Sequence, residues 1–266
     1  MKIQEGRVEI RDEFEIGTAG NAPLLGDIFL PPLRQENRPA ILLIHGGGWM
    51  QGDRKQLRGY GILLARLGFV CICNSYRLSQ EAPWPAQIQD VNCALRFMRA
   101  RSKDLGIDPD RIGVSGNSAG GHLSLMSALE GSEEFEGEGG HSEFSSSVKA
   151  VCAIYPPTEI KMLEKVDPLL NAYGMLMGIK ATQEDYAKAS PIKYDLDGFP
   201  PTMLVHGSTD DVVNLTESTN FYQKLVNKNI PAELHIFAEE MHAFDGVSGY
   251  GRSVADLQAL FFSKYL

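Results

Sequence analysis

The stretch Arg111–Ser124 constrains what this chain can fold into more than any other part of the sequence. Alternating apolar residues lead into Gly-Asn-Ser-Ala-Gly at residues 116–120, and apolar residues with helical spacing follow. The pattern predicts a strand, a tight turn that carries Ser118, and a helix. Gly116 and Gly120 have no side chains, which would let the strand and the helix approach each other closely. We therefore expect the Ser118 hydroxyl to stand exposed above the edge of a sheet.

Strand and helix patterns alternate along the rest of the chain. Besides the strand before Ser118, the expected strands are apolar or alternating runs at Arg7–Ile16, Gly26–Leu30, Ala40–Ile44, Phe69–Cys73, Val148–Tyr155, Thr202–Val205 and Ala232–Phe237. The expected helices have apolar residues three and four apart, at 57–67, 88–98, 215–226 and 253–265. The sequence thus predicts the α/β class, with a mostly parallel central sheet of about eight strands, helices on both faces and an antiparallel edge strand at its N-terminal end.

The 266 residues fit a single domain, because α/β folds of this size are commonly one unit. Three segments lie between the regular elements. Residues 131–147 are rich in Gly, Ser and Glu and are expected to form a surface loop. Asp108-Pro-Asp110 predicts a turn into the strand before Ser118. Residues 159–190 predict one or two short helices, an insertion that would lie over Ser118 as a small cap.

Composition excludes several kinds of partner. The formal net charge is −9 at pH 7 and no stretch resembles a basic groove, so neither nucleic acid nor an anionic membrane surface is expected to bind. The chain begins without the apolar core of a signal peptide, and no apolar run approaches the ~18 residues of a transmembrane helix. The 4 cysteines lie in apolar contexts without C-x-x-C spacing, which predicts buried free thiols, a cytoplasmic location and no metal site.

Ser118 needs a base to take its proton before it can act as a nucleophile. Of the 6 histidines, His242 alone lies in a loop after the last expected strand, at the carboxyl edge of the sheet where ligands bind. His45 and His206 precede glycines at strand ends and are expected to organise those turns. His122 would point along its helix, away from the serine. His242 is therefore the predicted base.

The acid that orients this base should follow the penultimate strand, so that the chain order is Ser, Asp, His. Asp210 and Asp211 both lie there. The spacing His-Gly-x-x-Asp favours Asp210, with Asp211 as the reserve. Its carboxylate would accept the Nδ1–H of His242 and stabilise the imidazolium.

A glycine-rich loop after the first central strand could stabilise an oxyanion. In His45-Gly-Gly-Gly48 the consecutive glycines leave their N–H groups unobstructed. The N–H groups of Gly47 and Gly48 could converge on one oxygen with that of Ala119, which begins the helix after Ser118.

These motifs together resemble the α/β-hydrolases of the esterase and lipase group, and among them the branch of acetyl-xylan, feruloyl and other carbohydrate esterases. The stretches that carry the resemblance include His45-Gly-Gly-Gly-Trp49, Ser75-Tyr-Arg-Leu78, Pro83-Trp-Pro-Ala86 and Gly116-Asn-Ser-Ala-Gly-Gly-His-Leu123. The resemblance implies a cofactor-free serine esterase that hydrolyses short acyl esters, with a small-molecule substrate. Trp49, Tyr76 and Trp84, together with the insertion, are expected to line its pocket. Asn214 and Met241-His-Ala243 depart from the usual pattern around the acid and the base.

Two other readings remain open at this point. The His45–Trp49 turn also fits the H-G-G-x-W element of arylformamidase-like amidohydrolases, which share the same triad. The fold can also serve as a non-catalytic binding module, although none of the expected catalytic groups is missing here. A homo-oligomer is compatible with the sequence.

Overall fold

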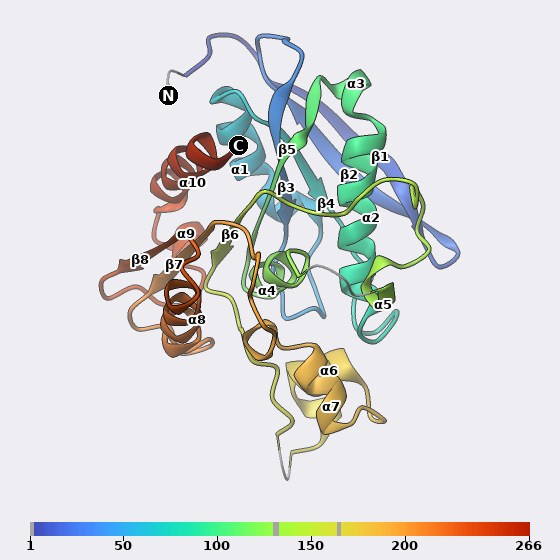
Figure 1. Cartoon of the computed structure of the whole chain (residues 1–266), viewed down its shortest axis with the longest axis vertical. Helices are drawn as coiled ribbons and strands as arrows, with labels where there is room; N and C mark the ends of the chain where they lie inside the picture. The colour runs from blue at the N-terminus through green and yellow to red at the C-terminus, as the bar shows by residue number, and fades with distance from the viewer. Residues whose placement is uncertain (1–2, 130–132, 164–165) are drawn as a thin grey trace.

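The computed structural model describes residues 3–129, 133–163 and 166–266. Within these residues one sheet has the strand order β1-β2-β4-β3-β5-β6-β7-β8 (Figure 1). The strands are β1 Glu9–Ala19, β2 Ala22–Leu30, β3 Arg38–Ile44, β4 Val70–Asn74, β5 Ile107–Asn117, β6 Ala150–Ile154, β7 Thr202–Gly207 and β8 Ala232–Phe237. β2 is antiparallel to β1 and β4, and every other neighbouring pair is parallel. The predicted eight-stranded, mostly parallel sheet is confirmed.

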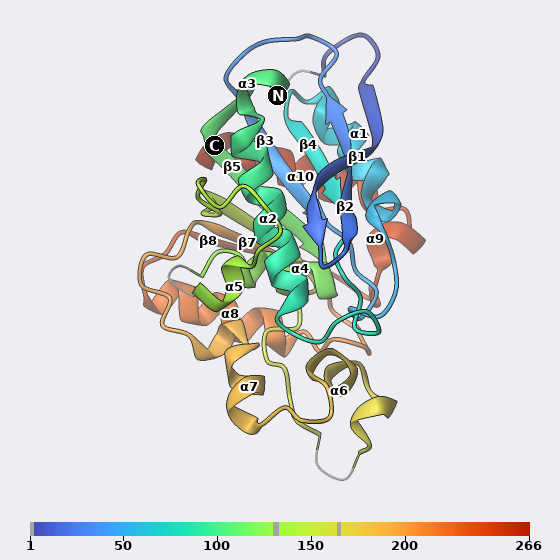
Figure 2. The same ribbon diagram turned by 90° about the vertical axis from the view of Figure 1, so that its right-hand side faces the viewer.

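Helices cover both faces of the sheet (Figure 2). The longer ones are α1 Arg58–Arg66, α2 Ala86–Ala100, α4 Ala119–Met126, α8 Thr216–Asn227 and α10 Gly251–Tyr265. Short helices are η1 Arg54–Leu57, α3 Ser102–Leu105, α5 Glu133–Glu136, η2 Pro168–Leu170, α6 Ala172–Met177, α7 Gln183–Lys188, η3 Pro191–Lys193 and α9 Phe244–Val247.

The central strands are mainly apolar because alternate side chains enter two different cores. In β3, Leu42 and Ile44 pack in the core under α2, α4 and α8. Ile41 and Leu43 pack in the other core, under α1 and α10. Cys71 and Cys73 also share this second core, as their two-residue spacing predicts, and all 4 cysteines of the chain are buried free thiols.

Three boundaries differ from the sequence-based expectation. β1 and β2 form a longer hairpin than predicted, since the pairing continues to Ala19 and Ala22. β5 begins at Ile107, so the expected turn at Asp108-Pro-Asp110 lies inside the strand, where the register against β3 shifts. The expected surface loop at 131–147 contains α5, while its first residues, 131 and 132, lie outside the described part.

The insertion at 159–190 extends past the end of the sheet that carries the loops after β3 and β4 (Figure 1). Of it, residues 159–163 and 166–190 are described. It holds α6 and α7, in agreement with the predicted short helices. The Trp84 N–H donates to the Leu176 carbonyl oxygen at 2.8 Å, which joins α6 to the loop before α2. Among the described residues, no helix has both the length and the apolar character required to cross a bilayer.

Candidate active site

The turn between β5 and α4 places Ser118 at an unusual backbone conformation, with φ 54° and ψ −119°. Its N–H donates to the Ile154 carbonyl oxygen of β6 at 2.9 Å. A Cβ on Gly120 would lie 2.0 Å from the Ile44 carbonyl oxygen, and one on Gly116 would lie 2.4 Å from the Gly120 carbonyl oxygen. Real Cβ atoms do not approach backbone oxygens this closely, so only glycine fits at either end of the turn.

Three side chains that are far apart in the sequence form one line of hydrogen bonds. His242 Nε2 lies 3.0 Å from Ser118 Oγ, and His242 Nδ1 lies 2.7 Å from Asp210 Oδ2. A carboxylate only accepts hydrogen bonds, so the proton of a neutral imidazole is on Nδ1 and the lone pair on Nε2 faces the serine hydroxyl. Ser118 and His242 are half-buried, while the Asp210 side chain is fully enclosed.

Asp210 is held by more donors than His242 alone. Its Oδ1 accepts the N–H groups of Val212 at 2.9 Å and Val213 at 2.8 Å, and His206 Nε2 lies 3.3 Å from its Oδ2. Burial alone would raise the pKa of the Asp210 carboxyl, but the hydrogen bonds from His206, His242 and Val213 outweigh it and hold that pKa well below its usual value. The neighbouring Asp211 is exposed. The structure therefore brings Asp210, and not Asp211, to the histidine.

His206 has a larger part in this geometry than the organisation of a turn. It is fully buried, with Nε2 at 2.8 Å from the Val213 carbonyl oxygen and Nδ1 at 2.7 Å from Ser218 Oγ. Since the carbonyl oxygen can only accept, Nε2 carries the proton and Nδ1 accepts from the Ser218 hydroxyl. The same Nε2–H points close to the Asp210 carboxylate, a contact that the spacing His206-Gly-x-x-Asp210 could have indicated.

The loop of three glycines runs directly beside the serine. A Cβ on Gly46 would lie 3.3 Å from the Ser118 Cβ. Gly47 and Gly48 have φ values of 114° and 60°, in the range that favours glycine. Within the described residues, the N–H groups of Gly47, Gly48 and Ala119 donate to no other group of the chain. An N–H group without an acceptor in the chain is what an oxyanion donor requires.

The three aromatic residues predicted to line the pocket have different positions. Trp49 and Tyr76 are 2% and 4% exposed and belong to the hydrophobic core. The Tyr76 ring stacks on His45 at 4.2 Å, and its hydroxyl donates to the His45 carbonyl oxygen. Trp49 meets His122 edge-to-face at 5.2 Å. These two therefore support the glycine loop and α4 from beneath, in contrast to the expected substrate contact. Only Trp84 is partly exposed.

The other buried histidines cannot easily be protonated. Burial lowers the pKa of His45 and of His122 to about 4. His122 Nε2 donates to the Ala189 carbonyl oxygen at 2.7 Å, which ties α4 to the end of the insertion. Both side chains have structural contacts away from Ser118.

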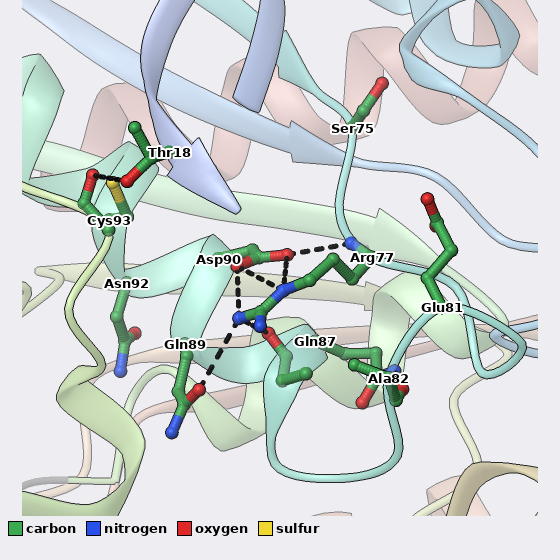
Figure 3. A network of polar contacts seen from close by, with 12 residues as sticks. Thr18, Ser75, Arg77, Glu81, Ala82, Gln87, Gln89, Asp90, Asn92 and Cys93 are labelled. Carbon is green, nitrogen blue, oxygen red and sulfur yellow. Dashed lines mark hydrogen bonds and ion pairs between the residues drawn. The ribbon is translucent and has the colours of Figure 1, made fainter. Parts of the chain in front are cut away.

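An ion pair between Arg77 and Asp90 holds the loop between β4 and α2 (Figure 3). The Arg77 guanidinium donates through Nε and Nη2 to both carboxylate oxygens of Asp90, at 2.7 to 3.1 Å. Asp90 Oδ2 also accepts the Arg77 backbone N–H at 2.8 Å, and Nη2 reaches the Ala86 carbonyl oxygen. The loop after β4 is thereby fixed to the first turns of α2.

A cavity of about 420 Å³ lies between α1 and α9, and its lining contains none of the side chains of Ser118, His242 and Asp210. Its lining includes Asn117, which precedes the serine, and Ala243, which follows the histidine. Among the described residues, no group of three or more His, Cys, Asp or Glu side chains has the arrangement of a metal site.

A sequence model of the BD-FAE family matches residues 26–225. This range contains Ser118 and Asp210, and His242 follows it. The probable carboxylic ester hydrolase LipM of Mycobacterium tuberculosis (strain ATCC 25618 / H37Rv) is 31% identical over 216 residues, which are 78% of this chain and 49% of LipM. The chain spans about half the length of the curated relatives LipM and LipC.

Two solved esterase structures match nearly the whole chain. A truncated form of a carbohydrate esterase from gut microbiota has a TM-score of 0.80 and 26% identity, and the match covers 97% of this chain and 100% of that chain. The thermophilic esterase Est2 of Thermogutta terrifontis has a TM-score of 0.82 at 23% identity, covering 97% of this chain and 94% of that chain, a likeness of fold alone.

Proposed function

We propose that this chain, which belongs to the BD-FAE family and has the α/β-hydrolase fold, is a carboxylic ester hydrolase with Ser118 as its nucleophile. The observation that carries the proposal is the line Ser118–His242–Asp210, with contacts of 3.0 and 2.7 Å. The names of the relatives, a carboxylic ester hydrolase and a carbohydrate esterase, support the same class of reaction.

In the proposed mechanism, Ser118 Oγ attacks the carbonyl carbon of the ester while His242 Nε2 takes the serine proton. The oxyanion that forms accepts hydrogen bonds from the N–H groups of Gly47, Gly48 and Ala119. When the carbon–oxygen bond to the alcohol breaks, His242 returns the proton to the leaving oxygen. A water molecule then cleaves the acyl-enzyme by the same route, and no cofactor takes part.

Each charge that develops in this mechanism has a counterpart in the site. Loss of one oxyanion donor typically costs about 3–4 kcal/mol of transition-state stabilisation. Asp210 stays ionised because its carboxyl pKa is held low, so it can stabilise the imidazolium of His242 throughout the cycle.

We further infer that the substrates are short acyl esters, with acetylated carbohydrates as the preferred class. The support is the match to a carbohydrate esterase over nearly the whole chain. The insertion lies against Gly48, where Ala172 Cβ is 3.7 Å from the position that a Gly48 Cβ would take. This packing restricts the space near the oxyanion loop and favours small acyl groups.

One experiment tests both the chemistry and the chain-length preference. The wild-type protein should hydrolyse p-nitrophenyl acetate and butyrate and react with a fluorophosphonate probe, with rates that fall toward the laurate ester. Ser118→Ala should lose both reactions, with a decrease of about 10⁴-fold or more in kcat. Ser124→Ala, on the same helix, should retain both.

A binding module without catalysis would fail to react with the probe, and an amidohydrolase would prefer N-formylkynurenine to the esters. Either result would contradict the proposed esterase. A maximum at laurate would contradict only the short-acyl preference, because the nucleophile would still be established.

A further inference from the structure

A second set of buried polar side chains adjoins His242, which the Tyr155 ring contacts. Asp245 accepts hydrogen bonds from two tyrosine hydroxyls, from Tyr155 at 2.5 Å and from Tyr60 at 2.6 Å. The Tyr155 hydroxyl in turn accepts a hydrogen bond from Asn117 Nδ2 at 3.2 Å. Tyr60, Tyr155 and Asp245 are all buried. Since Asn117 is the residue before Ser118, the chain of contacts reaches the nucleophile turn.

Tyr155 contacts the His242 ring and is the neighbour in sequence of the residue that binds the Ser118 backbone. It follows the last residue of β6, between the strand that leads to Ser118 and the strand that leads to Asp210. The centroid of its ring lies 4.6 Å from that of the His242 imidazole, with the planes tilted by 57°. Its preceding residue, Ile154, accepts the Ser118 N–H at 2.9 Å. Tyr155 is therefore held close to both the Ser118 backbone, through Ile154, and the His242 ring.

The backbone at Tyr155 has a conformation that a large side chain rarely adopts. Its φ is 39°, in the left-handed region that favours glycine. The Tyr155 N–H donates to the Val205 carbonyl oxygen at 2.6 Å, so the backbone is held there by β7 while the hydroxyl is held by Asp245. Strained residues of this kind persist where their surroundings over-determine them, and such places cluster at functional sites.

Asp210 by itself does not fix the imidazole. Its single contact on Nδ1 leaves the ring free to tilt about that hydrogen bond, and the loop around His242 is partly exposed. The Tyr155 ring lies against the imidazole and restricts that tilt. Asp245, three residues after His242, ties the same loop to the phenol.

We propose that Tyr155, anchored by Asp245, is a positioning residue that sets the His242 imidazole relative to the turn that carries Ser118. The inference rests on the proposed function, in which these two residues are the base and the nucleophile. Misplacement of reacting groups by about 1 Å can cost about 10²-fold in rate. Tyr155 therefore acts on kcat through His242, with no contact to the substrate required.

The two tyrosines offer a matched pair of variants. Tyr155→Phe and Tyr60→Phe each remove one buried hydroxyl that donates to Asp245, so both should lower the urea midpoint of unfolding to a similar extent. Only Tyr155 also touches His242 and Asn117. With p-nitrophenyl acetate, Tyr155→Phe should lower kcat by about 10-fold with KM changed by less than about 2-fold, whereas Tyr60→Phe should keep kcat within about 2-fold of wild type.

Equal losses of kcat in the two variants, or an unchanged kcat in Tyr155→Phe, would overturn the proposal. The contacts of Tyr60 and Tyr155 with Asp245 would then serve stability alone. If Tyr155→Phe does not fold, Asp245→Asn replaces it, because the amide keeps the size of the side chain but not the acceptor pair. A kcat for Asp245→Asn within about 2-fold of Tyr60→Phe would likewise overturn the proposal. An inactive wild type, or an active Ser118→Ala, would instead reject the proposed function itself.

Discussion

At the scale of single residues, two adjacent aspartates have opposite surroundings. Asp210 points into the protein, where two backbone N–H groups, His206 and His242 surround its carboxylate. Asp211 points to solvent. A buried carboxylate without partners is costly, so the set of donors at Asp210 is what allows a permanent negative charge behind His242.

This difference leads to a prediction for the two conservative variants. Asp210→Asn should reduce kcat on p-nitrophenyl acetate by about 10⁴-fold, because an amide can no longer hold the productive tautomer of His242. Asp211→Asn should leave kcat within about 2-fold of wild type. Steady-state kinetics on both variants, with circular dichroism to verify folding, provide the measurement. A comparable loss in both would show that the acid is not Asp210 alone.

At the scale of elements, the site depends on how closely α4 lies against β3. The closest approach is at Gly120, where even a methyl group would collide with the Ile44 carbonyl oxygen. Neither partner is the end of a flexible side chain, so a larger residue would displace the strand or the helix. The Tyr76 ring packs on His45, and the Trp49 ring packs on His122. These two contacts hold the glycine loop in position relative to α4.

Gly120→Ala should therefore reduce the free energy of unfolding by about 3 kcal/mol or more, at the upper end of overpacking effects. Gly59→Ala is the matched control, because Gly59 lies in α1 with open space around its Cβ position. There the same substitution should be neutral or stabilise by about 0.5–1 kcal/mol. Urea denaturation followed by circular dichroism gives both values, and a Gly120→Ala protein as stable as Gly59→Ala would contradict the close packing.

At the scale of the whole molecule, two buried histidines make stability depend on pH. The pKa of His45 and of His122 is about 4 in the folded protein, compared with the usual 6.5. As the pH falls below 6.5, the unfolded chain takes up protons at these positions and the folded protein does not. Protonation therefore favours unfolding, and stability is lost on the acid side.

Each of the two histidines should reduce the free energy of unfolding by about 1.4 kcal/mol per pH unit between pH 6.5 and 4. The low carboxyl pKa of Asp210 also makes the free energy of unfolding decrease as the pH falls. This decrease begins only below the usual carboxyl pKa of 3.8. Urea titrations at pH 7, 6 and 5 measure the slope, and His122→Leu should make it shallower even if that variant is less stable overall. A stability independent of pH over this interval would show that these side chains are not held neutral by burial.

The features that could be predicted from the sequence are those encoded within a few neighbouring residues. Apolar runs place β3, β4, β6 and β7, and the glycines on either side of Ser118 specify the strand–turn–helix because no other residue fits that backbone. The approximate places of the glycine loop, the acid and the histidine follow from the order of strands along the chain. Local backbone chemistry and periodicity are sufficient for such inferences.

The contacts between distant side chains depend on the tertiary structure. It directs Asp210 inward and Asp211 outward, places Trp49 and Tyr76 in the core, and assembles Tyr155, Asp245 and Asn117 beside His242. Such contacts join residues far apart in the sequence, with 124 positions between Ser118 and His242 and 185 between Tyr60 and Asp245. They depend on the packing of several elements at once, so no window of neighbouring residues contains the information that selects them.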